Sequence, residues 1–150
     1  MIIIRIWDYR LLPYLPDAQF KGQLRELVAI MRAWRDDGKT NHLLINKVME
    51  YDKSHLTTYF MKYCYWLGQR YHKPVSVKYA LEFQEFCPEV IGFIDTPIFD
   101  GWHTKQYLRM NMSNLAEKNF YGIGKSRITD EEWQRLCEGY KTITGEDYKI

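Results

Sequence analysis

Residues 17–38 read DAQFKGQLRELVAIMRAWRDDG and contain the clearest helical pattern of the chain. Their apolar side chains recur at the 3.6-residue period of an amphipathic helix, namely Phe20, Leu24, Leu27, Val28, Met31 and Trp34. Asp17 stands at the position of a helix N-cap, and Asp37 with Gly38 marks the end. The pattern therefore predicts one long helix with one face in the protein core.

The rest of the chain also reads as helical. Further helices are expected over residues 46–71 (with a restart at Ser54), 76–86, 102–118 and from Thr129 to about Gly139. The last of these rests on Thr129 and Glu132, which have the spacing of a capping box. Residues 88–101 contain two prolines and predict an irregular connection. Because hardly any segment alternates with period two, the fold class is expected to be all-α, a compact single-domain helical fold with irregular loops in its second half.

Length, composition and charge limit the classes of protein to consider. The 150 residues are 46% hydrophobic and 16% aromatic, which is enough for one folded domain and argues against disorder. The net charge of +2 excludes the strongly basic coat of a histone-like protein. Residues 1–75 hold 12 Lys and Arg against 7 Asp and Glu, whereas residues 76–150 hold 9 against 12. Affinity for a polyanion is therefore expected mainly in the first half.

Cysteines, histidines and the first residues favour a cytoplasmic protein without cofactors. Cys64, Cys87 and Cys137 are odd in number and widely spaced, which fits neither a disulfide framework nor a metal knuckle. The four histidines include no HExxH motif and no pair four residues apart, so no metal site is expected. The apolar residues 1–4 are followed at once by Arg5 and Asp8, too soon for a signal peptide or a membrane span.

The polar side of the long helix has the composition of a reactive site. Four residues share one stripe along it: Gly22, Glu26, Ala29 and Ala33. Four basic residues lie beside that stripe: Lys21, Arg25, Arg32 and Arg35. A carboxylate between small residues with a basic flank is suited to bringing a polyanion to an acid or base. The alternative is purely structural, with small residues for helix packing, an ion pair of Glu26 with Arg5 or Lys21, and a solvated basic face.

Five short segments of the first half, in order and with similar spacing, resemble one family of DNA-repair enzymes. They are residues 5–8 (RIWD), 15–27 with its ending GQLREL, 37–39 (DGK), 51–53 (YDK) and 70–74 (RYHKP). They resemble the pyrimidine-dimer DNA glycosylase/AP lyase family, the endonuclease V of phage and its bacterial relatives. Residues 120–125 (FYGIGK) add a fainter similarity to the end of the phage enzyme. The resemblance implies a DNA-repair core over residues 1–75 with a helical extension, residues 76–150, packed on it.

This resemblance implies an activity on damaged duplex DNA, at pyrimidine dimers or abasic sites. An N-terminal α-amine would form a Schiff base at C1′ of the damaged nucleotide, and Glu26 would stabilise the positive charge and assist proton transfers. The amine belongs to Met1, or to Ile4 if the preceding residues are removed. An α-amine suits the reaction because its pKa of about 7.7–8.0 leaves a neutral fraction near pH 7, unlike a lysine at about 10.4.

Basic and aromatic side chains are expected to hold the DNA. Arg5, Lys21 and Arg25 would bind phosphates while the nucleotide is extruded from the duplex. Tyr121 lies between glycine and basic neighbours and is a candidate for stacking on a base. The complete set expected to contact DNA is Arg5, Gln19, Lys21, Gly22, Arg25, Arg32, Tyr121 and Lys125.

Two features favour another class of function, a non-catalytic DNA-binding or protein-interaction member of the same fold family. Met1, Ile2 and Ile3 precede the position at which the family has its amine, and Gln19 stands where the family has a helix histidine. A further alternative places a different activity or a partner-binding surface in residues 76–150, which have no counterpart in the resemblance. The sequence identifies no protein partner.

Overall fold

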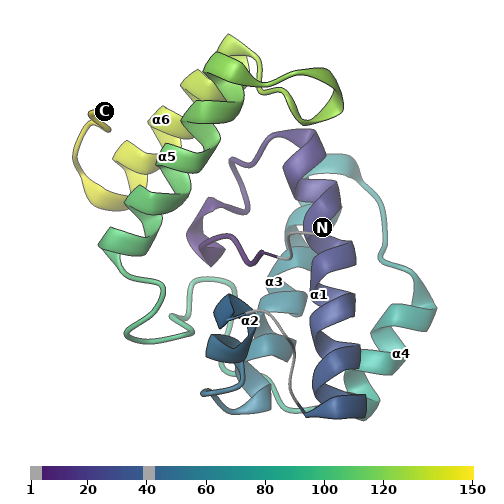
Figure 1. Cartoon of the computed structure of the whole chain (residues 1–150). Coiled ribbons are helices and arrows are strands. Elements are labelled where there is room, and N and C mark those ends of the chain that lie inside the picture. The colour runs from purple at the N-terminus through teal and green to yellow at the C-terminus, as the bar shows by residue number, and fades with distance from the viewer. Residues whose placement is uncertain (1–4, 39–42) are drawn as a thin grey trace. The chain divides into compact units, whose positions relative to one another are not determined.

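The computed structural model describes residues 5–38 and 43–150. Within these residues the chain consists of helices and loops, without a strand, which confirms the predicted all-α class (Figure 1). The α-helices are α1 (Asp17–Asp37), α2 (Leu43–Val48), α3 (Lys53–Tyr71), α4 (Val77–Phe86), α5 (Lys105–Tyr121) and α6 (Asp130–Thr144). Of two short 3-10 helices, η1 (Tyr9–Leu11) precedes α1 and η2 (Gly124–Ser126) lies between α5 and α6.

Helix α1 forms where the periodicity predicts it. It begins at Asp17 itself, one residue earlier than an N-cap at that position implies. Phe20 already donates its N–H to the carbonyl of Pro16 at 2.9 Å, so the helical hydrogen-bond pattern includes this proline carbonyl. Gly38 follows the helix with a φ of 69°, a left-handed conformation that favours glycine. The predicted apolar face is buried in the core at Phe20, Leu27 and Met31.

The helical stretch expected over residues 46–71, with a restart at Ser54, forms as two separate helices, α2 and α3, and α2 begins three residues earlier than expected. Asp52 caps α3, since its side chain accepts the N–H of Ser54 at 3.0 Å. An aspartate that binds this N–H favours a helix start over a continuous helix. The restart therefore lies at Lys53, next to the predicted Ser54. The end near Pro74 is confirmed, with His72 in a left-handed conformation after α3.

The capping box of α6 is confirmed, but its predicted end is wrong. Thr129 accepts the N–H of Glu132, and the Glu132 side chain accepts the N–H of Thr129. Gly139 lies inside the helix against the ring of Tyr14, where a Cβ would come within 2.4 Å of Cγ. This glycine thus permits close packing, and the helix continues to Thr144, with Gly145 as its C-cap at a φ of 79°.

The helix predicted over 76–86 and the irregular segment 88–101 are confirmed by α4 and the loop after it. Helix α5 starts three residues later than its predicted range and ends three residues later. The later start arises because Thr104 acts as the N-cap, accepting the N–H of Tyr107.

The chain divides into two compact units, which are described separately. The first contains residues 1–6 and 23–100, and the second contains residues 7–22 and 101–150. The single domain, with a core over 1–75 and an extension over 76–150, stays a prediction. No helix of the described residues combines the length and the apolar composition that crossing a membrane requires.

Candidate functional site

Glu26, the predicted catalytic carboxylate, is half-buried on α1 in the first unit. Its Oε2 accepts the backbone N–H of Arg5 at 2.8 Å and the amide of Gln23 at 3.4 Å. Burial raises the pKa of Glu26 to about 7, and the Arg5 backbone and the charges of Arg5 and Arg25 oppose this rise. The carboxyl group therefore changes its protonation state near neutral pH, as an acid or base catalyst requires.

The backbone beside Glu26 is held by two residues that the sequence pattern did not identify as part of a site. Gln23 is fully buried, and its amide donates to the carbonyl of Arg5 at 2.7 Å. The hydroxyl of Tyr59, on α3, donates to Oε1 of Gln23 at 3.0 Å. Tyr59 itself is fully buried in the core. The sequence contained one signal for the role of Gln23. This polar residue lies three positions before Glu26 and next to the apolar Leu24 and Leu27.

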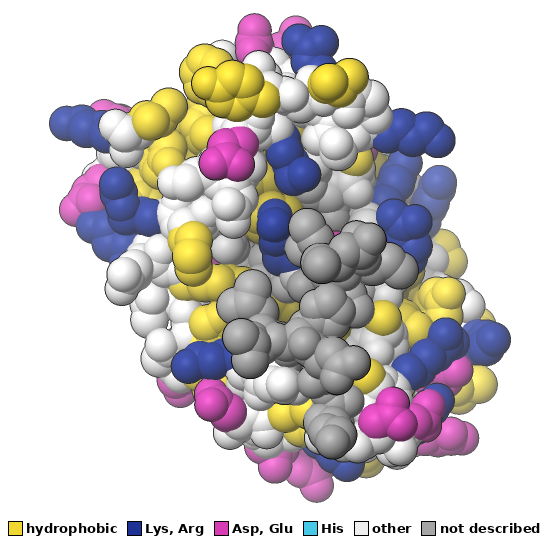
Figure 2. Space-filling model, in the orientation of Figure 1, with side chains coloured by type: hydrophobic (Ala, Val, Ile, Leu, Met, Phe, Trp, Pro, Cys, Tyr) yellow, Lys and Arg dark blue, Asp and Glu magenta, His cyan; other side chains and the backbone are white. Residues whose placement is uncertain are grey.

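The predicted basic residues of α1 differ in their surroundings. Arg25 is exposed, and so is Lys21, which belongs to the second unit. Arg32 binds Glu82 of α4 through its Nε and Nη2 at 3.0–3.2 Å, so an acidic neighbour already faces its guanidinium. Figure 2 shows Lys and Arg side chains at several separate places on the visible face. Charge alone therefore does not define a DNA-binding face.

The second unit brings Gln19 next to the segment that carries Lys125. Gln19 is only 8% exposed, and its amide donates to the carbonyl of Ser126, in η2, at 3.0 Å. Its Oε1 is buried without a hydrogen-bond partner. Lys125 and Tyr121 are exposed, and Tyr121 is 82% exposed at the end of α5. Gly22 is half-buried.

The predicted nucleophile lies outside the described residues, because Met1 and Ile4 both fall in the segment 1–4 that precedes them. No group of three His, Cys, Asp or Glu side chains that would hold a metal ion occurs within residues 5–38 and 43–150. The first unit thus presents a carboxylate beside the backbone of Arg5, together with the exposed Arg25.

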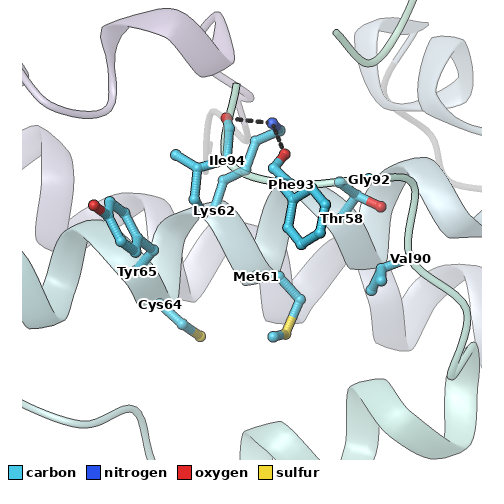
Figure 3. Close-up of a pocket in the computed structure, with 9 residues that line it drawn as sticks. All are labelled: Thr58, Met61, Lys62, Cys64, Tyr65, Val90, Gly92, Phe93 and Ile94. Atoms are coloured by element: carbon cyan, nitrogen blue, oxygen red, sulfur yellow. Dashed lines mark hydrogen bonds between the residues drawn. The ribbon is translucent and has the colours of Figure 1, made fainter. Parts of the chain in front are cut away.

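A second feature of the first unit is a pocket of about 410 Å³ between α3 and the loop that follows α4. Its lining is mostly apolar, with Met61, Tyr65 and Phe93 among the lining residues (Figure 3). Lys62 is only 2% exposed, and its Nζ donates to the carbonyls of Phe93, Ile94 and Thr96 at 3.0, 2.6 and 2.8 Å. The amino group of Lys62 thus binds the backbone of the loop after α4, so Lys62 has a structural role: it connects this loop to α3.

Within the described residues the chain is helical, and α1 carries a partly buried carboxylate next to the backbone of Arg5. The exposed Arg25 lies in the same unit, and a carboxylate with a cation nearby is suited to acid–base chemistry on a polyanion. The family model of pyrimidine dimer DNA glycosylase matches residues 3–77. The chain therefore belongs to the pyrimidine dimer DNA glycosylase family, a family of DNA repair with DNA as its substrate. No curated protein and no solved structure gives a significant match to the chain.

Proposed function

We propose that this protein is a DNA glycosylase and AP lyase that acts on pyrimidine-dimer or abasic sites in duplex DNA. An N-terminal amine is the nucleophile and Glu26 is the catalytic carboxylate. The observation that carries the proposal is the 2.8 Å hydrogen bond from the Arg5 backbone to Glu26, because it places the backbone nitrogen of Arg5 beside a carboxyl group of raised pKa. Membership of the family supports the class of substrate.

The reaction begins at C1′ of the damaged nucleotide. The amine nitrogen forms a bond to C1′ while the bond from C1′ to the leaving group breaks; the leaving group is the damaged base, or the hydroxyl at an abasic site, and it takes up the proton that the nitrogen loses. The C1′–O4′ bond of the sugar ring then breaks, O4′ takes up a proton, and the nitrogen lone pair forms the C=N bond of the protonated Schiff base. Removal of a C2′ proton then breaks the bond to the 3′ phosphate. Glu26, with its pKa near 7, stabilises the iminium charge as a carboxylate and carries protons between these steps.

The reach of the nucleophile depends on which residue carries the amine. An amine at Ile4 is one residue from the nitrogen of Arg5, which is at most about 3.6 Å of chain. An amine at Met1 is four residues away, or up to about 14 Å. We therefore expect the form whose N-terminal residue is Ile4 to react faster than the form that begins at Met1. The intact mass of the native protein identifies which form is present.

DNA contacts are assigned to the predicted residues in each unit. In the first unit, Arg5, Arg25 and Arg32 hold phosphates, with Arg32 exchanging Glu82 for a phosphate oxygen. In the second unit, Lys21 and Lys125 bind phosphates and Tyr121 stacks on an extruded base. Gly22 gives the DNA close access to α1, and Gln19 positions η2 through Ser126.

Borohydride trapping with a duplex that contains one abasic site tests the enzyme directly. Borohydride reduces the C=N bond of a Schiff base to a stable amine, so a covalent protein–DNA adduct is expected in a denaturing gel. Peptide mapping of the adduct is expected to place the DNA on the N-terminal residue. A protein that binds the duplex without adduct or strand cleavage would instead be the non-catalytic member of the family, and an adduct on Lys62 would refute the N-terminal nucleophile.

The salt dependence of duplex binding tests the assignment of Arg25. Because each phosphate contact releases condensed counterions, Arg25→Gln is expected to lower the slope of log affinity on log salt by about 1. Arg35→Gln removes the same charge from α1 and is the matched control, since Arg35, which pairs with Asp36 at 2.8 Å, is outside the set of residues assigned to DNA. Equal slopes for wild type and Arg25→Gln would remove Arg25 from the DNA-binding set.

A further inference from the structure

The backbone of Arg5 is held at both of its polar groups. Its N–H donates to Glu26 at 2.8 Å, and its carbonyl accepts from the amide nitrogen of Gln23 at 2.7 Å. The same nitrogen lies 3.4 Å from Oε2 of Glu26. Gln23 and Glu26 are three residues apart on α1 and so face the same neighbour. The side-chain amide of Gln23 therefore contacts both the backbone of Arg5 and the carboxylate of Glu26.

Tyr59 determines which way that amide is oriented. Its hydroxyl is fully buried with the rest of its side chain and donates to Oε1 of Gln23 at 3.0 Å. A glutamine amide has an acceptor oxygen on one side and a donor nitrogen on the other. With the oxygen bound to Tyr59, the nitrogen faces Arg5 and Glu26. The reverse orientation would set the amide oxygen against a carbonyl and a carboxylate, which is repulsive.

We propose that Gln23 and Tyr59 are positioning residues for the reaction of Glu26. Tyr59 orients the amide of Gln23, and Gln23 keeps the chain that leads to the amine next to the carboxylate. This inference rests on the proposed function, because it assigns the two residues to the Glu26 chemistry. These three residues and Arg5 all lie in the first unit.

A merely structural role for the same hydrogen bonds predicts a different outcome. Loss of a buried hydrogen bond lowers the stability of the fold wherever it occurs. Loss of the orientation of Gln23 additionally changes the proton affinity of Glu26, because the Arg5 N–H and the Gln23 amide both lower its pKa against the effect of burial. The pKa of Glu26 therefore separates the two roles.

The test uses Tyr59→Phe and Gln23→Met in the full chain, with two measurements. Carbon-13 NMR titration of the Glu26 carboxyl is expected to show its pKa rising above the wild-type value of about 7 in both variants. The single-turnover rate of borohydride trapping on the abasic duplex is expected to fall by about tenfold to a hundredfold, because the amine is no longer held at the carboxylate. The loss should appear in the maximal rate and leave duplex affinity unchanged.

Tyr63→Phe is the matched control. Tyr63 lies on the same helix and is equally buried, so this variant also loses one buried hydroxyl. It is expected to leave the pKa of Glu26 and the trapping rate at their wild-type values. An unchanged or lower pKa of Glu26 in Tyr59→Phe overturns the positioning role, even if that variant is less stable.

The titration also keeps the two proposals apart. A wild-type protein that forms no adduct refutes the proposed enzyme, whereas the NMR shift still reports whether Tyr59 and Gln23 act on Glu26. Conversely, a Tyr59→Phe variant that forms the adduct at the wild-type rate, with an unchanged pKa of Glu26, refutes the positioning role. The proposed enzymatic function would then still stand.

Discussion

Glu26→Gln is expected to slow formation of the borohydride-trapped adduct by about 10²–10⁴-fold, the usual contribution of a general acid or base. Glutamine has the same shape as glutamate, and its Oε1 still accepts the N–H of Arg5, so the site keeps its geometry. The variant loses the negative charge that stabilises the iminium and the group that carries protons. The measurement is a single-turnover time course on the abasic duplex, and a rate within threefold of wild type would contradict the role of Glu26.

The pH profile of the same reaction gives a second readout. Burial raises the pKa of Glu26 to about 7, so its reactive carboxylate form increases as the pH rises from 6 to 8. The neutral amine increases over the same range. Wild-type trapping should therefore rise in two overlapping steps, and Glu26→Gln should retain only the step that belongs to the amine.

Glu26→Gln should be more stable than wild type at alkaline pH. This gain would show that its loss of activity does not arise from unfolding. The pKa of Glu26 is higher in the folded than in the unfolded protein, so between about pH 4.5 and 7 the folded state binds more protons. Stability contributed by the neutral acid is complete below this range and disappears as the pH rises through it. A neutral glutamine does not suffer this loss, and we expect a gain of about 1–3 kcal/mol at pH 8.

Local patterns were sufficient for most of the helices and for the position of the carboxylate. Periodicity along residues 17–38 defines α1, and the Thr129 and Glu132 pair defines the start of α6, because both signals involve residues close in sequence. Glu26 was identified as the one acid between small residues on the polar face of α1. Its burial raises the pKa to about 7, against the opposing effect of its hydrogen bond with the Arg5 backbone.

Features that depend on distant partners could not be predicted. Gly139 resembles a helix end until Tyr14 is found against it. Gln23 is an ordinary polar residue on α1 until Tyr59, 36 residues further along the chain, binds its amide. Lys62 follows the buried Tyr59 by three residues, yet only the carbonyls of the loop after α4 explain a lysine in this position.

Lys62→Met is expected to lower the free energy of unfolding by about 2–4 kcal/mol. The Nζ atom donates to three carbonyls of residues 93–96, and a buried acceptor that loses its donor costs about 1–3 kcal/mol. The expected loss is smaller than three times this cost because the loop is partly exposed, so water replaces some of the lost hydrogen bonds. Methionine retains the length and the apolar body of lysine, which keeps the packing of α3 against the loop.

Urea unfolding measures this loss, with Lys78→Met as the control. Lys78 lies exposed on α4 in the same unit, so its replacement removes the same charge and should change the free energy of unfolding by less than about 0.5 kcal/mol. Equal midpoints for the two variants would show that the three carbonyls do not depend on Lys62. A loss confined to Lys62→Met, with faster amide hydrogen exchange in residues 93–96, would show that this buried lysine holds the loop to α3, because exchange reports local opening of the segment that has lost its donor.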